Sequence, residues 1–125
     1  MDVIPQPPSP WDIREADFPR EGSEPDRLRF LLRYAVLAPS TRNTQPWRFG
    51  IGDHQVAVHL DPSRWNQVAD PDRREMYISI GCAIENLVIA ACHFGYRAAV
   101  DYIPPGDDPT LLARVRLLPG GCPQP

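Results

Sequence analysis

The segment 76–92 constrains the fold of this chain more than any other part of its sequence. Apolar side chains recur there at helical spacing, and the main stripe consists of Met76, Ile80, Ala83, Ile84, Leu87, Val88 and Ala91. From residue 78 onward the predicted helix is apolar on nearly all sides. A helix with that pattern is buried in the centre of a protein, so we expect the other segments to pack around it.

The ends of this helix also have sequence signals. Asp70 followed by Pro71 predicts the start, since proline is favoured at the first helical position. Gly95 is suited to the C-cap. Gly81 costs helix stability and, with neighbouring small residues, forms a surface that favours close backbone approach. Packing within the chain is the first explanation for this surface, and a subunit interface is the second.

A second helix is predicted from Ser23, which is a good N-cap, with Pro25 in the first turn. Its apolar stripe consists of Leu28, Leu31, Leu32, Ala35 and Val36. Pro39 is expected to stop it, because a residue before proline avoids the α region.

Four strands are predicted from alternating apolar residues. The runs 47–51 and 56–60 flank a Gly-Asp-His turn and form one hairpin, and the runs 98–103 and 113–117 flank a Pro- and Asp-rich turn and form another. The element order is α-β-β-α-β-β. Hairpins imply an antiparallel sheet, so the predicted class is α+β, with a small sheet of about four strands and helices packed on it.

The two ends differ in composition from the part between them. We predict a Pro-rich N-terminal arm at 1–22, one domain at 23–118 and a Gly/Pro tail at 119–125. The arm is either a loose tail or a strap around a partner subunit, with Trp11 and Phe18 as anchors.

Composition excludes several functions. The net charge is −3 and all 13 basic residues are Arg, so no Lys is present for a Schiff base or a P-loop. An acidic chain argues against nucleic-acid binding, and the most apolar run, 87–92, is too short to span a membrane. His54, His59 and His93 lack metal-ligand spacing. Three cysteines without a CxxC pair indicate reduced thiols and a cytoplasmic protein.

The segment 38–47, Ala-Pro-Ser-Thr-Arg-Asn-Thr-Gln-Pro-Trp, is the strongest candidate for a functional site. Two prolines fix its ends, and every residue between them has a polar side chain that can donate a hydrogen bond. Because the loop joins a helix to a core strand, it can hold donors around an acceptor-rich ligand such as a phosphate, a sugar chain or a flavin edge. On composition alone, an ordinary polar loop with local side-chain turns explains it as well.

The residues themselves favour a ligand-binding role. APSTRNTQPWRF closely resembles the APSxxNxQPW segment of FMN-dependent nitroreductases. Together with HLDPSRW, DPDRREMYISIGCAIENLVIAACHFGY and LLARVRLLP, it resembles the Acg-like branch of that superfamily, and specifically the N-terminal half of such proteins. The similarity runs from Ser23 to Leu118.

The resemblance implies a nitroreductase-like α+β fold, a homodimer or an association with a second half-domain, and FMN bound between the two halves. It assigns FMN contacts to Pro39, Ser40, Thr41 and Asn43, with Gln45 in support. Arg42 occupies a position that is often His in this branch, and physically it can pair with a phosphate or a carboxylate. No residue is assigned a catalytic or metal-binding role.

The implied reaction moves electrons from NAD(P)H through FMN to a nitroaromatic, quinone or similar small acceptor. One departure bears on it, because the chain has no RRSxR-type motif, which grips the FMN phosphate in ordinary nitroreductases, within residues 1–30. Two alternatives therefore accompany the enzyme hypothesis: a non-catalytic protein that binds or sequesters flavin, and a truncated half-domain that needs a partner chain.

Overall fold

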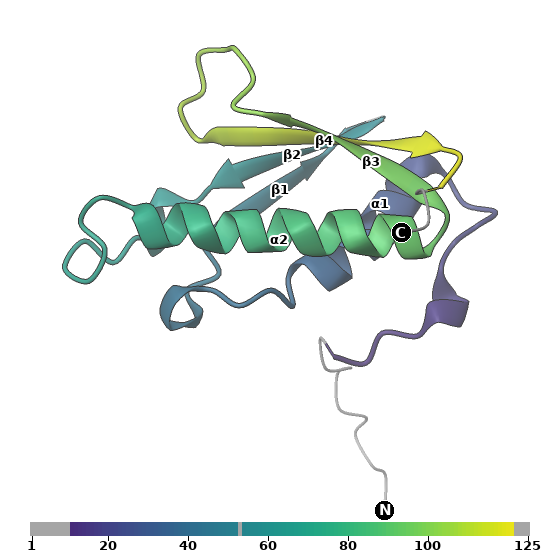
Figure 1. Cartoon of the computed structure of the whole chain (residues 1–125), viewed down its shortest axis with the longest axis horizontal. Helices are drawn as coiled ribbons and strands as arrows, with labels where there is room; N and C mark the ends of the chain where they lie inside the picture. The colour runs from purple at the N-terminus through teal and green to yellow at the C-terminus, as the bar shows by residue number, and fades with distance from the viewer. Residues whose placement is uncertain (1–10, 53, 122–125) are drawn as a thin grey trace, which may run out of the picture.

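The structure is a computed structural model, and it describes residues 11–52 and 54–121. It has two layers, with two α-helices on one side of a four-stranded antiparallel sheet (Figure 1). The main elements are α1 (Glu24–Ala35), β1 (Trp47–Ile51), β2 (Gln55–Leu60), α2 (Arg74–His93), β3 (Tyr96–Tyr102) and β4 (Leu111–Pro119). The predicted α+β class and the order α-β-β-α-β-β are confirmed.

The sheet order is β1-β2-β4-β3, and every neighbouring pair is antiparallel. Both predicted hairpins form, with Phe49 opposite Val58 in one and Val100 opposite Val115 in the other. The pairing of β2 with β4 joins the hairpins into one sheet and contains a register shift between Val58 and His59. Alternation along each strand sends one set of side chains toward the helices and the other set to solvent.

The core lies between the sheet and the helices. The inner face of the sheet contributes Val56, Val58, Leu60, Ala113, Val115 and Leu117, all buried. The α1 stripe contributes Leu28 and Leu31, which have no exposed surface, and α2 contributes Met76 and Leu87. These residues form one continuous cluster, as expected for a single small domain.

The start of α1 is where the sequence predicts it. Ser23 Oγ accepts a hydrogen bond from the Asp26 backbone N–H, and the Asp26 side chain accepts one from the Ser23 N–H, which completes a reciprocal capping box. The helix ends at Ala35, earlier than Pro39 implies, and Val36 is its C-cap. The segment after it is therefore free to form a loop before β1.

The predicted start of α2 at Asp70 and Pro71 is wrong, because the helix begins at Arg74. The N-cap is Arg73, whose side chain makes no capping hydrogen bond, and the buried carboxylate of Asp70 takes over that role: it accepts hydrogen bonds from the backbone N–H groups of Glu75 and Met76, each at 3.0 Å. Because the carboxylate reaches these groups from outside the helix, the residues between form a turn. The charge also lies where the helix dipole favours an anion.

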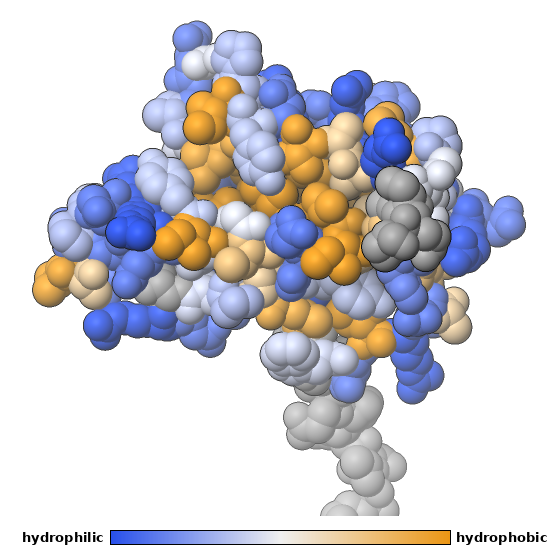
Figure 2. All heavy atoms as spheres, viewed as in Figure 1, coloured by the Kyte–Doolittle hydropathy of each residue, from blue (hydrophilic) through white to orange (hydrophobic). Residues whose placement is uncertain are grey.

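The prediction that α2 is the buried central helix is confirmed for one side of the helix and wrong for the other. One side packs on the sheet and on α1, but Ile78 and Ile89 are 56% and 58% exposed. We call the exposed side, formed by Ile78, Gly81, Cys82, Glu85 and Ile89, the open face of α2. Apolar atoms are visible along this helix in Figure 2.

By length and composition alone, α2 is long and apolar enough to cross a membrane. However, 44% of its most apolar 18-residue stretch is buried inside the protein. Its packing against β3 and α1 accounts for that burial and identifies it as the core helix of the domain.

The N-terminal segment is tied to its own chain at Phe18. That ring is buried, stacks on Phe94 with centroids 4.4 Å apart, and meets Phe30 edge-on. Phe18 is thus neither part of a loose tail nor available as an anchor on a partner. Trp11 is 72% exposed, and the part of the predicted arm before it, like the end of the predicted tail, lies outside the described residues.

The prediction that all three cysteines are reduced is wrong. Cys92, at the end of α2, is disulfide-bonded, whereas Cys82 is a free thiol. Cys122 lies outside the described residues. The argument for a cytoplasmic location from reduced thiols therefore loses its basis, and the location itself stays a prediction.

Replacing Asp70 with Ala tests the capping role. Two backbone N–H groups in the first turn of α2 lose their acceptor, so we expect the free energy of unfolding to fall by about 1–2 kcal/mol, measured by urea denaturation followed by circular dichroism. Asp101→Ala, at an exposed carboxylate on β3, is the control. A loss no larger than that of the control contradicts the assignment.

Candidate functional site

The candidate loop, residues 39–46, runs between the end of α1 and the start of β1. Pro46 at its end is fully buried, whereas Pro39 at its start is exposed. A short 3-10 turn, η2 (Thr41–Asn43), lies between them and contacts α2. The loop is thus fixed to the core on the β1 side and faces outward in its middle.

The backbone of this loop is strained. Arg42, Asn43 and Gln45 have φ values of 49°, 55° and 50°, in the left-handed region. Each costs a non-glycine residue on the order of 1 kcal/mol, although Asn tolerates it best. Such conformations persist only where surrounding contacts hold them, and they are concentrated at functional sites.

Hydrogen bonds inside the loop hold this shape. The Gln45 N–H donates to Ser40 Oγ at 3.0 Å, the Asn43 N–H donates to the Ser40 carbonyl at 3.0 Å, and the Gln45 side-chain amide donates to Asn43 Oδ1 at 3.3 Å. Ser40 Oγ and Asn43 Oδ1 therefore act as acceptors within the loop. The Ser40 hydroxyl hydrogen and the Asn43 Nδ2 group stay available as donors.

The donors are accessible to a ligand. Arg42 and Asn43 are exposed, and Ser40 and Gln45 are half-buried. Thr44 has a hydroxyl oxygen that is buried without a hydrogen-bond partner. A buried polar atom without a partner is costly in a protein, so this hydroxyl is a place where a water molecule or a ligand atom is needed.

A second segment supports the loop from outside. This is the short turn η3 (Pro62–Arg64), directly after β2. The Asp61 N–H donates to the Pro46 carbonyl at 2.8 Å, and Arg64 Nη1 donates to the Thr44 carbonyl at 3.1 Å. Arg64 Nε also lies 3.5 Å from Asp61 Oδ2. The sequence assigned no role to either side chain.

Asp61 is held in its charged form. The Ser63 hydroxyl donates to Asp61 Oδ1 at 2.6 Å, and this bond is the main reason that the pKa of Asp61 lies below its ordinary value; the Ser63 backbone N–H and the charges of Arg48 and Arg64 act in the same direction. The carboxylate is therefore available as the partner of Arg64 at neutral pH.

A cavity connects the loop to the open face of α2. It has a volume of about 280 Å³ and is lined by Pro39, Ser40, Glu75, Ile78, Ser79 and Cys82. Its wall on the loop side supplies the Ser40 hydroxyl, and its other wall is mostly apolar. A flat ring with polar edges held by the loop would lie against α2.

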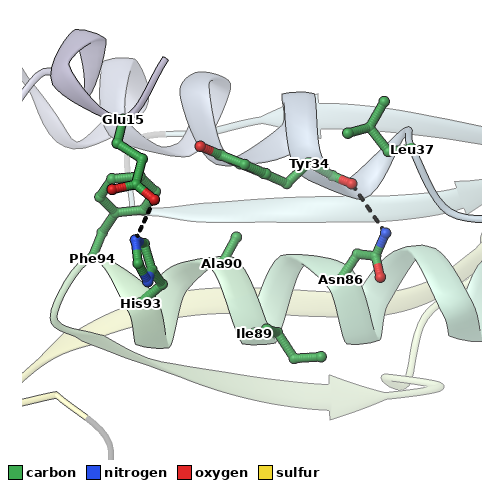
Figure 3. Close-up of a pocket in the computed structure, with 8 residues that line it drawn as sticks. All are labelled: Glu15, Tyr34, Leu37, Asn86, Ile89, Ala90, His93 and Phe94. Carbon is green, nitrogen blue, oxygen red and sulfur yellow. Dashed lines mark hydrogen bonds and ion pairs between the residues drawn. The ribbon is translucent and has the colours of Figure 1, made fainter. Parts of the chain in front are cut away.

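A second, larger cavity lies toward the other end of α2, between this helix and α1 (Figure 3). It has a volume of about 370 Å³ and contains none of the loop residues. Asn86 Nδ2 donates to the Tyr34 carbonyl at one end, and His93 pairs with Glu15 at 2.9 Å at the other. Burial and the Glu15 charge raise the pKa of Tyr34. No sequence signal pointed to this cavity.

The histidines lie apart in the structure. His54 pairs with Glu24, His59 contacts Thr110 and Asp108, and His93 contacts Glu15. Within residues 11–52 and 54–121, no group of three or more His, Cys, Asp or Glu side chains is arranged to hold a metal ion.

Comparison with known proteins identifies the family. Rv3131 of Mycobacterium tuberculosis, provisionally named an NAD(P)H nitroreductase, is 34% identical over 94 residues, covering 75% of this chain and 27% of Rv3131. Acg of the same organism, also provisionally named an NAD(P)H nitroreductase, is 33% identical over 94 residues, covering 75% of this chain and 28% of Acg. No protein-family model matches.

The chain belongs to the nitroreductase superfamily, in its Acg-like branch. Solved structures agree on the fold. A nitroreductase-like protein from Streptococcus mutans superposes with a TM-score of 0.61 at 14% identity, covering 79% of this chain and 81% of the other. A protein from Parabacteroides distasonis, provisionally named an NADH dehydrogenase/NAD(P)H nitroreductase, gives 0.60 at 16% identity, covering 78% and 75%.

This nitroreductase-like chain spans little more than a quarter of the length of the curated relatives it matches. The structure places five of the six predicted site residues on one outward-facing loop: Pro39, Ser40, Arg42, Asn43 and Gln45. Thr41 belongs to the same turn by its backbone, η2. The supporting residues in the 61–64 segment were missed, although the sequence HLDPSRW was part of the resemblance.

Replacing Ser63 with Ala tests why the pKa of Asp61 is lowered. Loss of the hydroxyl donor should raise the pKa of Asp61 toward its ordinary value, measured by carboxyl 13C NMR titration. A lowered pKa stabilises the fold above the ordinary Asp pKa, and this contribution is lost as the pH falls through the lowered value. The parent should therefore be more stable than the variant at neutral pH, and this difference should shrink as the pH falls through the lowered pKa of Asp61.

Thr110→Ala is the matched control, because Thr110 lowers the pKa of Asp108 in the same way. It should raise the pKa of Asp108 and leave that of Asp61 unchanged. An unchanged Asp61 pKa in Ser63→Ala contradicts the assigned cause.

Proposed function

We propose that the loop 39–46 binds FMN and that the protein is a flavin-dependent NAD(P)H oxidoreductase that passes electrons to a nitroaromatic, quinone or similar small acceptor. Membership of the nitroreductase superfamily supports the reaction class. The observation that carries the binding site is the strained loop, which offers free donors and whose Ser40 borders a cavity against the open face of α2.

The residues present fit a flavin. The ring edge of FMN is rich in acceptors, and the loop offers the Ser40 hydroxyl, the Asn43 amide and exposed backbone around a left-handed turn. The Thr44 hydroxyl lacks a partner and is suited to a bound water or a ligand atom. Arg42 is exposed and can pair with the phosphate or another anion. Ile78 and Cys82 supply an apolar surface for the ring.

FMN, when bound, supplies the redox chemistry by accepting a hydride from NAD(P)H and passing electrons to the acceptor. The protein binds and orients the ring and controls access to it. Ser40 and Asn43 would fix the ring edge by donating hydrogen bonds. No side chain in the loop is needed as an acid or a base, so we assign no catalytic residue.

A protein that only binds or sequesters flavin is the alternative. The observation that favours it is that residues 1–30 contain no RRSxR-type motif for the FMN phosphate. NADH and NADPH oxidation by the flavin-loaded protein distinguishes the two functions, because only the enzyme turns over.

The double variant Ser40→Ala with Asn43→Ala tests the site. Loss of two donors should weaken FMN binding by about tenfold or more, measured by quenching of flavin fluorescence. The melting temperature should fall only slightly, because both side chains lie outside the hydrophobic core and the variant loses only their hydrogen bonds with Gln45. Gln67→Ala, at an exposed amide after η3, is the control. Unchanged FMN affinity in the double variant contradicts the site.

A second nitroreductase-like half is proposed to cover the open face of α2. A Cβ added to Gly81 would meet no atom within 4 Å, so packing within the described chain does not explain this small residue. Ile78 and Ile89 are apolar and more than half exposed. In the purified protein, the molecule that covers this face is a second copy of the chain. In a cell, a separate nitroreductase-like half-domain with a similar apolar surface can take the same place.

Ile89→Asp tests this interface. The parent should sediment as a dimer, and the variant as a monomer, because an unpaired carboxylate would be buried in the interface. Val68→Asp is the control, since Val68 is 95% exposed and lies outside the open face. A parent that sediments as a monomer while holding FMN tightly contradicts the proposal.

A further inference from the structure

One peptide group in the loop is held from both sides. The Thr44 carbonyl and the Gln45 N–H belong to the same planar unit, so fixing one fixes the other. The carbonyl accepts a hydrogen bond from Arg64 Nη1 at 3.1 Å, and the N–H donates to Ser40 Oγ at 3.0 Å. Arg64 and Ser40 therefore contact opposite ends of a single peptide plane.

This plane lies at the strained part of the loop. Asn43 before it and Gln45 after it have φ values of 55° and 50°. Rotation of this peptide changes ψ of Thr44 and φ of Gln45, so without an external restraint it would relieve the left-handed conformation of Gln45 and turn the Gln45 N–H away from Ser40 Oγ. Ser40 would then lose the bond that orients its hydroxyl.

Arg64 is itself held in place. Its Nε lies 3.5 Å from Asp61 Oδ2, and Asp61 in turn accepts hydrogen bonds from the hydroxyl and the backbone N–H of Ser63. The Asp61 side chain is 14% exposed and that of Arg64 is 52% exposed, so the carboxylate is largely shielded from solvent and the guanidinium is partly open to it. Ser63 thus holds Asp61, Asp61 pairs with Arg64, and Arg64 donates to the Thr44 carbonyl.

The geometry points to Arg64 as a positioning residue for the ligand site: it fixes the Thr44–Gln45 peptide and, through it, the direction in which the Ser40 hydroxyl donates. The inference rests on the proposed function for the identity of the ligand, FMN. The restraint on the peptide itself does not depend on that identity.

The loop restraint is tested first in the flavin-free protein. Arg64→Ala should speed hydrogen exchange of the Gln45 amide about tenfold, the effect of losing one charge-assisted hydrogen bond to its peptide. Arg64→Lys keeps a donor and should restore much of the protection.

The matched control is Arg29→Ala. Arg29 forms an exposed ion pair with Asp26, also at 3.5 Å and three residues apart, but on α1 and away from the loop. If Arg64 forms only an ordinary surface ion pair, the Gln45 amide should exchange at the same rate in Arg64→Ala and Arg29→Ala. That result overturns the inference.

FMN affinity, measured by fluorescence quenching, is the second readout. Arg64→Ala should weaken binding about tenfold, and Arg29→Ala should leave it unchanged. Faster Gln45 exchange with unaltered FMN affinity overturns the role in ligand positioning. A parent protein that does not bind FMN contradicts the proposed function instead, and the exchange data then still decide whether Arg64 restrains the loop.

Discussion

Burial of one side of α2 is the constraint on which the rest of the structure depends. Met76, Ile80, Leu87 and Ala91 on that side meet the inner face of the sheet and α1, and fully burying one large apolar side chain contributes about 1.5–3 kcal/mol. Both helices consequently lie on the same side of the sheet. The opposite side of α2 then faces away from the core, and the described residues leave it open.

The candidate site follows from this arrangement. The loop 39–46 lies beside the start of α2, so the hydroxyl of Ser40 borders a cavity against the open face. Its strained backbone is stabilised by contacts on two sides, Ser40 from within and the 61–64 segment from behind. Rigid donors next to an apolar surface are what a flat, acceptor-rich ring requires.

Local signals predicted much of this structure. The Ser23 cap, both hairpins and the loop between two prolines depend on neighbouring residues, and the sequence contains those residues directly. The start of α2 was misplaced because the Asp70 carboxylate caps groups five and six residues ahead. The helical spacing of apolar residues showed that α2 is apolar, but it could not show which of its sides packs on the sheet and which stays open. The β2–β4 pairing, the packing of Phe18 and the bond from Arg64 to Thr44 join distant segments, and no local pattern encodes them.

The visible absorption spectrum of the purified protein, recorded after FMN is added and the excess is removed by desalting, tests the central claim most directly. The account predicts flavin bands close to stoichiometric with the protein, because the loop and the open face of α2 together hold the ring. A protein that stays colourless after this treatment contradicts the claim that the chain binds FMN.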